Sequence, residues 1–406
     1  FAPTCPVASL RLLFYLAAKN KKRVVLADYE KAFLQARLTE RVVLRPPKLV
    51  RKAGKLWHAL KAIYGLRISP RLFFQRLREA MKAILFENLL VDPTFYVRNG
   101  VYVVTHVDDI LVVGTDEEIA TFFKDMGEHL ALKGGPEVTE DAVAFFCGKQ
   151  YQRVAGGFRV RHDPKYLEQI VEELGLGMAK PVMTPGVADL KPSTQQEKEL
   201  WSEQLSPPMH YRFRKVVGML RFVVTERPDL LFTVHVLSRD LNAPTGESWA
   251  RLRRCGRYIQ GTKERWLNLV VKSAGAQAQL VGYSDSDYAG DHITRRSVSC
   301  AWIELDGVPI ASYARQQSLV ATSTAEAEFY AMSGCAVELL GASSTSRIES
   351  VPHNASEDRF LKREKPCPKA RPWKTEASRR SVLVASGDRC KQTLADCRSE
   401  GFGEPS

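Results

Sequence analysis

The sequence has few features that would tie it to a membrane or to an oxidising compartment. No apolar stretch reaches the roughly eighteen residues that a membrane helix needs, and residues 10–18 are interrupted by Arg11. The chain begins with Phe1 and shows no signal-peptide pattern. Its eight cysteines are scattered, without a Cys-x-x-Cys pair or a matching histidine cluster. These absences argue against a zinc site and a disulfide framework, and they favour reduced intracellular thiols in a fragment of a longer reading frame.

Positive charge exceeds negative charge in this chain. Lys and Arg number 59 against 46 Asp and Glu, which gives a formal net charge of +13. Such an excess favours a polyanionic partner, with nucleic acid as the leading candidate. The segment 246–260 concentrates four arginines in one predicted helix: Arg251, Arg253, Arg254 and Arg257. A solvated helix face and a surface that binds a nucleic acid backbone explain this cluster equally well.

Acidic residues stand at the ends of apolar runs in two places. Asp28 follows one such run, and the pair Asp108-Asp109 separates the β-branched runs 101–107 and 110–113. The second pattern predicts a β-hairpin with a two-residue Asp-Asp turn. Carboxylates gathered in this way need cations, and ions of the Mg²⁺ type take carboxylate oxygens together with substrate phosphates. Asp is also a favoured turn residue, so the doublet on its own does not establish catalysis.

Apolar periodicity predicts an α+β fold. With 406 residues, the chain is long enough for two or three domains. Helices are predicted at residues 10–18, 70–86, 117–130, 164–174, 209–225, 229–241, 246–260 and 324–340. Strands are predicted at residues 23–28, 145–153, 157–162, 280–284, 298–305 and 309–314, in addition to the hairpin. Residues 175–206 are rich in Pro, Gly, Lys, Ser and Gln, which indicates a linker. The tail beyond Gly341 shows little periodicity, and we expect it to be mostly disordered.

Further motifs accompany the acidic residues in a fixed order. They are the segments 28–33 (DYEKAF), 63–71 (IYGLRISPR), 106–109 (HVDD), 227–230 (RPDL), 283–291 (YSDSDYAGD) and 323–328 (STAEAE). In this order the chain resembles the reverse transcriptase of copia-type long-terminal-repeat retrotransposons, from near residue 1 to about Gly341. The resemblance implies a polymerase palm with truncated fingers in residues 1–175, a linker and helical thumb or connection in 176–270, and a partial ribonuclease H-like α/β domain in 271–341. Residues 342–406 form a tail that does not match.

The resemblance also implies a two-metal nucleotidyl transfer. The primer 3′-hydroxyl attacks the α-phosphate of a dNTP, and two Mg²⁺ ions, or Mn²⁺ in their place, act on the attacking and leaving oxygens. Asp28 and Asp108 are expected to bridge both ions, and Asp109 completes the acidic cluster. The backbone carbonyl of Tyr29 is expected to help hold the nucleotide-side metal. The implied partners are an RNA or DNA template with its primer and the dNTPs.

Two segments are implied to contact the nucleotide and template. By resemblance, the ring of Phe33 lies under the sugar and excludes a ribose 2′-hydroxyl; the alternative is an ordinary core Phe. Tyr64, Gly65 and Arg67 are implied to line the nascent base pair, with Gly65 permitting close approach at a strand-to-helix junction. The family usually has Gln where this chain has Ile68, and Tyr where it has His106.

A ribonuclease H site is matched only in part. Asp285 and Glu326 match two of the four acidic residues that such a site uses. Glu326 also fits a capping box with Ser323 as the N-cap, which is a purely structural role. The tail aspartates 358, 388 and 396 do not follow a β-patterned strand of the expected kind. We therefore expect an incomplete site and negligible ribonuclease H activity.

The leading functional hypothesis is an RNA-directed DNA polymerase. The alternative is a catalytically inactive retrotransposon relic that only binds nucleic acid, and a nuclease alone is disfavoured because its acidic set is less complete. The resemblance implies a location in cytoplasmic virus-like particles, in the nucleus, or in both. The oligomeric state is left open.

Overall fold

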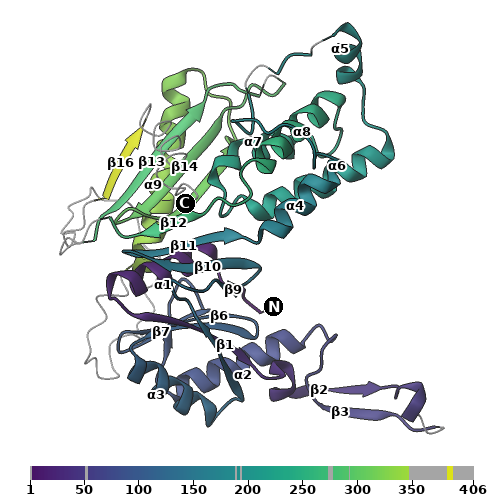
Figure 1. The fold of residues 1–406 in the computed structure, drawn as a ribbon. Helices are drawn as coiled ribbons and strands as arrows, with labels where there is room; N and C mark the ends of the chain where they lie inside the picture. The colour runs from purple at the N-terminus through teal and green to yellow at the C-terminus, as the bar shows by residue number, and fades with distance from the viewer. Residues whose placement is uncertain are drawn as a thin grey trace, which may run out of the picture.

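The computed structural model describes residues 2–50, 54–187, 190–192, 194–272, 278–291, 293–346 and 382–386. These residues form sheets of six, four, four and two strands, together with a layer of helices. Figure 1 shows the six-stranded sheet at the bottom, one four-stranded sheet in the middle, and the other beside the helical layer at the top. The chain is therefore a mixed helix-and-sheet protein, as its sequence predicts.

The six-stranded sheet is built around the predicted hairpin and has the strand order β4-β5-β6-β7-β1-β8. Its strands are β1 (Arg23–Tyr29), β4 (Glu87–Asn88), β5 (Phe95–Arg98), β6 (Val101–His106), β7 (Asp109–Gly114) and β8 (Leu132–Glu137). Strands β6 and β7 are buried on both faces, which explains their continuous apolar sequences. Leu111 and Val113 pack toward helix α1 (Val7–Lys19), whereas Ile110 and Val112 pack toward helices α2 (Ser69–Ala83) and α3 (Asp116–Gly127).

Helix α1 lies between sheets and is buried along most of its length. Its second neighbour is the four-stranded sheet β12-β11-β10-β9. The strands of that sheet are β9 (Ala144–Phe146), β10 (Lys149–Val154), β11 (Gly157–His162) and β12 (Leu267–Val270). The ring of Phe14 on α1 stacks on that of Tyr151, with centroids 4.7 Å apart. Burial from two sides accounts for the apolar sequence around this helix.

The helical layer lies between β11 and β12 in the chain. Its elements are α4 (Pro164–Glu173), α5 (Gln195–Ser202), α6 (Pro207–Val223), the 3₁₀ helix η3 (Pro228–Leu230), α7 (Leu231–Arg239) and α8 (Gly246–Gln260). Helices α4, α6, α7 and α8 share one apolar core. Residues 175–206, which were predicted to be a linker, contain helix α5, which was not predicted. It buries no side chain, so it leaves no apolar periodicity, and Thr194 caps it by accepting a hydrogen bond from the Glu197 amide.

A buried ionic cluster joins the helical layer to the sheets. The carboxylate of Glu226, after α6, lies 2.7 Å from Lys149 Nζ on β10 and 2.7 Å from His162 Nε2 on β11. All three side chains are almost fully buried. Arg11 of α1 donates a hydrogen bond to the carbonyl of Thr225, next to Glu226. Because charges this deep must be paired, the cluster fixes α6 relative to α1, β10 and β11.

The third sheet has the order β15-β14-β13-β16 and is covered by a long helix. Its elements are β13 (Leu280–Asp287), β14 (Val298–Leu305), β15 (Val308–Gln316), α9 (Thr324–Ser346) and β16 (Val382–Ser386). A Cβ at Gly282 would lie 2.7 Å from both Cys335 Sγ and Leu339 Cδ1, so this glycine lets α9 pack close to β13. No helix in the described part of the chain combines the length and apolarity needed to cross a membrane.

Strand β16 corrects the expectation that the tail offers no β-patterned strand before its aspartates. It pairs in parallel with β13, Leu280 opposite Val382, and ends two positions before Asp388 in the sequence. The segment is short and far in sequence from the other strands, so its pairing depends on a long-range contact that local periodicity does not reveal. Most of the predicted disordered tail lies outside the described residues.

A two-stranded hairpin projects away from the six-stranded sheet (Figure 1). It consists of β2 (Arg37–Leu44) and β3 (Trp57–Lys61), with the 3₁₀ helix η2 (Lys48–Val50) between them. The 3₁₀ helix η1 (Ala32–Gln35) connects β1 to this hairpin. The hairpin therefore begins and ends beside the segments that carry Phe33 and Tyr64.

Candidate active site

The acidic residues predicted from the sequence meet at one end of the six-stranded sheet. Asp28 at the end of β1 lies directly opposite Asp109 of β7 in the antiparallel register. Residues opposite each other in such a pair lie on the same face of the sheet. Asp108 is in the adjoining turn, where its carbonyl accepts a hydrogen bond of 3.0 Å from the Tyr29 amide. Sheet register thus brings together acids that are far apart in the sequence.

The hairpin turn differs by one residue from the sequence prediction. His106 pairs with Asp109, so the two turn residues are Val107 and Asp108, not Asp108 and Asp109. Val107 has φ +61°, which is unfavourable for a β-branched residue. The apolar pattern suggested that Val107 belongs to the strand, and it gave no sign of this left-handed conformation. As a result, Asp109 is held by the sheet and Asp108 lies at the tip.

The carboxylate of Asp28 is in a negative environment. Burial, followed by the charges of Asp108 and Glu30, raises the pKa of Asp28, and Lys133 on β8 offsets part of the rise. Lys133 lies opposite Asp28 in the β1–β8 register and was not predicted as a site residue.

Asp109 is shifted in the same direction. Burial, followed by the charges of Asp108 and Asp28, raises the pKa of Asp109, and His106 lowers it in part. Part of each rise, after burial, comes from charge repulsion, since Asp108 raises the pKa of both groups and Asp28 raises that of Asp109. A divalent cation would relieve that repulsion, and carboxylate oxygens are the donors that Mg²⁺ prefers. The chemistry of the donors therefore suits a divalent ion. Among the described residues, however, no group of three or more His, Cys, Asp or Glu side chains is gathered closely enough to hold a metal ion.

The chain that follows β1 is fixed by a side chain that the sequence did not single out. Gln35 Nε2 donates hydrogen bonds to the carbonyls of Glu30, at 2.8 Å, and Ala131, at 2.9 Å. Its Oε1 accepts from the Ala131 amide at 2.7 Å. One amide thereby ties the loop after Asp28 to the segment before β8.

Phe33 lies within an aromatic group at the start of the hairpin. Its ring centroid is 4.6 Å from that of Tyr64 and 6.3 Å from that of Phe73 on α2. Phe33 is half-buried, and Tyr64 is 57% exposed. The ring thus packs against α2 and the adjoining core while remaining partly accessible, and its role under the nucleotide sugar stays a prediction.

The segment after β3 provides an open backbone surface beside this aromatic group. Gly65 has φ +96°, and no atom lies within 4 Å of the position that a Cβ would occupy. Ser69 Oγ donates to the Ile63 carbonyl at 2.6 Å and holds the turn against the start of α2. Arg67 is exposed. The predicted strand-to-helix junction is confirmed, with room for a ligand at Gly65.

The predicted ribonuclease H residues have different surroundings. Asp285 lies on β13. Glu326 is turned toward its own helix end, where its carboxylate accepts from the amide and hydroxyl of Thr322, both at 2.7 Å, and from Tyr330. The Glu326 amide donates to Ser323 Oγ at 3.1 Å, which is one half of the predicted capping box. The other half differs from the prediction, because the Glu326 carboxylate accepts from the amide of Thr322, one residue before the N-cap.

Glu328 is the acid of α9 that reaches β13. Its Oε1 accepts a hydrogen bond of 3.2 Å from the Ser286 amide, next to Asp285. Its Oε2 is buried without a hydrogen-bond partner among the described residues. Two residues two positions apart on a helix point roughly 200° apart, so only one of Glu326 and Glu328 can face β13. The two-residue spacing in the sequence implies that only one of these acids faces β13, but it does not show whether that acid is Glu326 or Glu328.

Comparison with known proteins gives a consistent set of matches. Residues 1–188 match the family model described as "Reverse transcriptase (RNA-dependent DNA polymerase)". The chain is 29% identical over 346 residues to the retrovirus-related Pol polyprotein from transposon RE2 of Arabidopsis thaliana, a match that covers 84% of this chain and 23% of that protein. It is 29% identical over 366 residues to the corresponding polyprotein from transposon TNT 1-94 of Nicotiana tabacum, covering 84% and 26%.

The chain also aligns with a solved structure of the foamy viral protease-reverse transcriptase in complex with an RNA/DNA hybrid. The TM-score is 0.46 and the sequence identity is 12%, and the alignment covers 88% of this chain and 46% of the other. The chain spans less than a third of the length of the two polyproteins.

Proposed function

Because the chain belongs to the reverse transcriptase region of the Pol polyproteins of copia-type retrotransposons, we propose that it extends a DNA primer with dNTPs along an RNA or DNA template. The observation that carries this proposal is the register that puts Asp28 opposite Asp109, with Asp108 in the adjoining turn. Asp28 and Asp109 are held by the pairing of strands and Asp108 by the hydrogen bond of its carbonyl to the Tyr29 amide, which supports a role that requires fixed positions.

Asp28, Asp108 and Asp109 are the residues that would hold the divalent ions. When bound, such ions activate the attacking hydroxyl and neutralise charge on the triphosphate. Asp28 and Asp109 are held by the central strands, and the Tyr29 amide fixes the turn through the Asp108 carbonyl. Gln35 holds the following loop in place. The site therefore presents oxygen ligands from a rigid frame.

Phe33, Tyr64, Gly65 and Arg67 are proposed to position the nucleotide and template. The half-buried ring of Phe33 blocks the space in which a ribose 2′-hydroxyl would lie. Gly65 leaves room for the new base pair, and the exposed guanidinium of Arg67 is available to a phosphate. Each of these contacts is made by the segments at the two ends of the β2–β3 hairpin.

The third sheet is proposed to be a ribonuclease H-like unit whose metal-binding face includes Asp285 and Glu328. The parallel β13–β16 pairing and the partnerless, buried Oε2 of Glu328 support this assignment. Glu326 serves as a helix cap in this proposal.

The polymerase proposal is tested by extension of a DNA primer annealed to poly-rA, with and without Mg²⁺. We expect dTTP incorporation that depends on the ion and stops with a chelator. Binding of the primer–template without any incorporation would instead support an inactive relic.

A further inference from the structure

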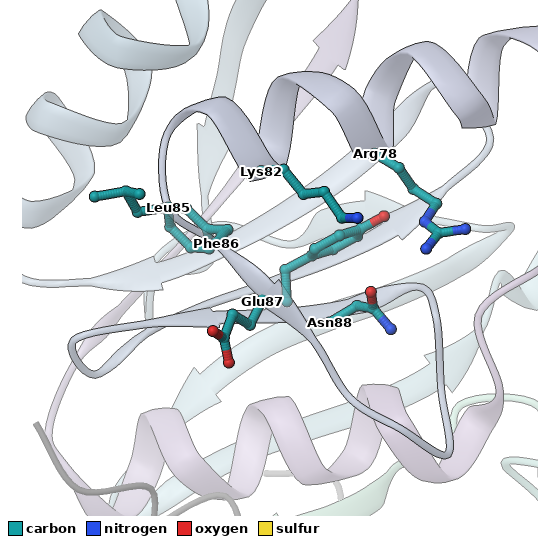
Figure 2. Close-up of a pocket in the computed structure, with 7 residues that line it drawn as sticks. Arg78, Lys82, Leu85, Phe86, Glu87 and Asn88 are labelled. Atoms are coloured by element: carbon teal, nitrogen blue, oxygen red, sulfur yellow. The ribbon is translucent and has the colours of Figure 1, made fainter. Parts of the chain in front are cut away.

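A cavity of about 390 Å³ lies at the edge of the six-stranded sheet, away from the acidic site. It is formed by the end of α2 with β4 and β5, and strands β6 and β7 separate it from β1. The lining residues are Arg78, Lys82, Leu85, Phe86, Glu87, Asn88 and Tyr96 (Figure 2). A volume of this size is within the range of small-molecule sites.

Two cations on α2 are directed at this cavity. Arg78 and Lys82 are four residues apart and share one face of the helix. Figure 2 shows both charged ends extending over the cavity, whereas the carboxylate of Glu87 points away from them. Neither cation forms an ion pair with any residue that the structure describes. The cavity therefore holds two positive charges without a protein counter-ion.

A buried hydroxyl completes the polar lining. Tyr96 is only 2% exposed, and its hydroxyl has no hydrogen-bond partner within the described ranges. Burial raises the pKa of Tyr96, with the nearby charge of Arg78 acting in the opposite direction. The hydroxyl consequently keeps its proton and is able to donate it to an acceptor. Buried polar groups are normally hydrogen-bonded, so this hydroxyl is available to an acceptor on a molecule that enters the cavity.

We propose that this cavity binds a small molecule through a phosphomonoester group. Two cations and one neutral donor suit a dianion, and a phosphomonoester carries close to two negative charges at neutral pH. A phosphodiester in a nucleic acid backbone carries only one. The cavity is larger than a phosphate needs, and the exposed side chain of Leu85 offers an apolar contact to the attached group. The site does not depend on the polymerase proposal.

The test is a calorimetric titration of the full chain, without divalent metal, with adenosine 5′-monophosphate as the probe. We expect saturable binding that inorganic phosphate competes with and that adenosine does not reproduce. Arg78→Gln with Lys82→Gln should weaken binding by about a hundredfold, because both charge-assisted contacts are lost. The matched control is Lys124→Gln with Lys165→Gln, which removes two exposed charges from α3 and α4. It should bind like the wild type.

Tyr96→Phe separates the hydroxyl from the packing of the ring. The melting temperature of the variant should be no lower than that of the wild type, because the hydroxyl that it removes has no hydrogen-bond partner among the described residues. The variant should bind the probe about tenfold more weakly. Unchanged affinity in Tyr96→Phe and in the Arg78/Lys82 variant would overturn the proposal. So would the absence of binding to the wild type, an equal loss in the Lys124/Lys165 control, or equal competition by an oligonucleotide without a terminal phosphate.

Discussion

Asp28 at the end of β1 lies opposite Asp109 at the start of β7, so the position of both carboxylates is set by the pairing of two central strands. That pairing is specified by apolar side chains that pack alternately toward α1 and toward α2 and α3. A slip of one residue would turn these side chains to the wrong faces and separate the two acids. The acidic site is therefore a direct consequence of the packing of the sheet.

Phe33→Ala should relax the choice of sugar. Loss of the half-buried ring opens space for a 2′-hydroxyl, so ribonucleotide incorporation relative to dNTP incorporation should rise by at least about tenfold. Removal of the contacts with Tyr64 and Phe73 should also cost roughly 2 kcal/mol, below the range for a fully buried Phe. Single-nucleotide incorporation kinetics measure the preference, and Phe33→Tyr retains the ring as a control. A folded Phe33→Ala protein with unchanged preference would show that Phe33 serves packing alone.

Glu226 should make stability depend on pH in the acid range. Burial opposes its charged form, but His162, Lys149 and Arg11 together lower the pKa of Glu226 to about 2, against 4.5 for an ordinary Glu. A carboxylate with a lowered pKa contributes stability that is present above pH 4.5 and is lost as the pH falls toward 2. This contribution is about 3 kcal/mol.

Glu226→Gln tests that dependence by urea unfolding between pH 2 and 6. The variant should be less stable near neutral pH, because Lys149 is left buried without its partner, and its stability should fall less steeply on acidification. Glu173→Gln breaks an exposed pair with Lys215 and should change little. An acid dependence in Glu226→Gln equal to that of the wild type would refute the assignment.

The two acids of α9 should differ in their effect on the ribonuclease H-like unit. Cleavage of an RNA–DNA hybrid should be very slow, and whatever Mn²⁺-dependent cleavage occurs should be lost in Asp285→Asn and Glu328→Gln. Glu326→Gln should retain it, because the Glu326 carboxylate is engaged by Thr322 and Tyr330. Assays with a labelled hybrid compare the three variants. Fast cleavage by the wild type, or equal losses in Glu326→Gln and Glu328→Gln, would contradict this view.

Much of the fold follows from local sequence patterns. The apolar runs around Asp108-Asp109 predicted the central hairpin, and periodicity predicted α4, α6, α7 and α8. The strands β2, β3, β5, β8 and β12 were not predicted, and the predicted strand over residues 145–153 is in fact two strands, β9 and β10, separated at Cys147 and Gly148. Other features that escaped prediction depend on long-range contacts or on unusual backbone. They include the left-handed conformation of Val107 and the parallel pairing of β16 with β13. They also include the hydrogen bonds through which Gln35 ties the loop after Asp28 to the segment before β8. Helix α5 escaped because it buries nothing.

The site was predictable to a similar extent. The acidic residues and Phe33 were named from motifs by resemblance to a family, and the structure brings Asp28 opposite Asp109, whereas the role of Phe33 stays a prediction. The partner that meets Asp28 from β8, Lys133, could not be named, since it depends on which strands become neighbours. The choice between Glu326 and Glu328 depends on how α9 is rotated about its axis, which two-residue spacing leaves undetermined.

The most direct test of the account compares wild type, Asp108→Asn and Asp141→Asn in Mg²⁺-dependent extension of a DNA primer on poly-rA. Asp141 is exposed and outside the acidic site, so its variant controls for the loss of one negative charge. We expect extension by the wild type and by Asp141→Asn, and no extension by Asp108→Asn, with primer–template binding retained by all three proteins. Unchanged extension by Asp108→Asn, or an inactive wild type that still binds the primer–template, would contradict it.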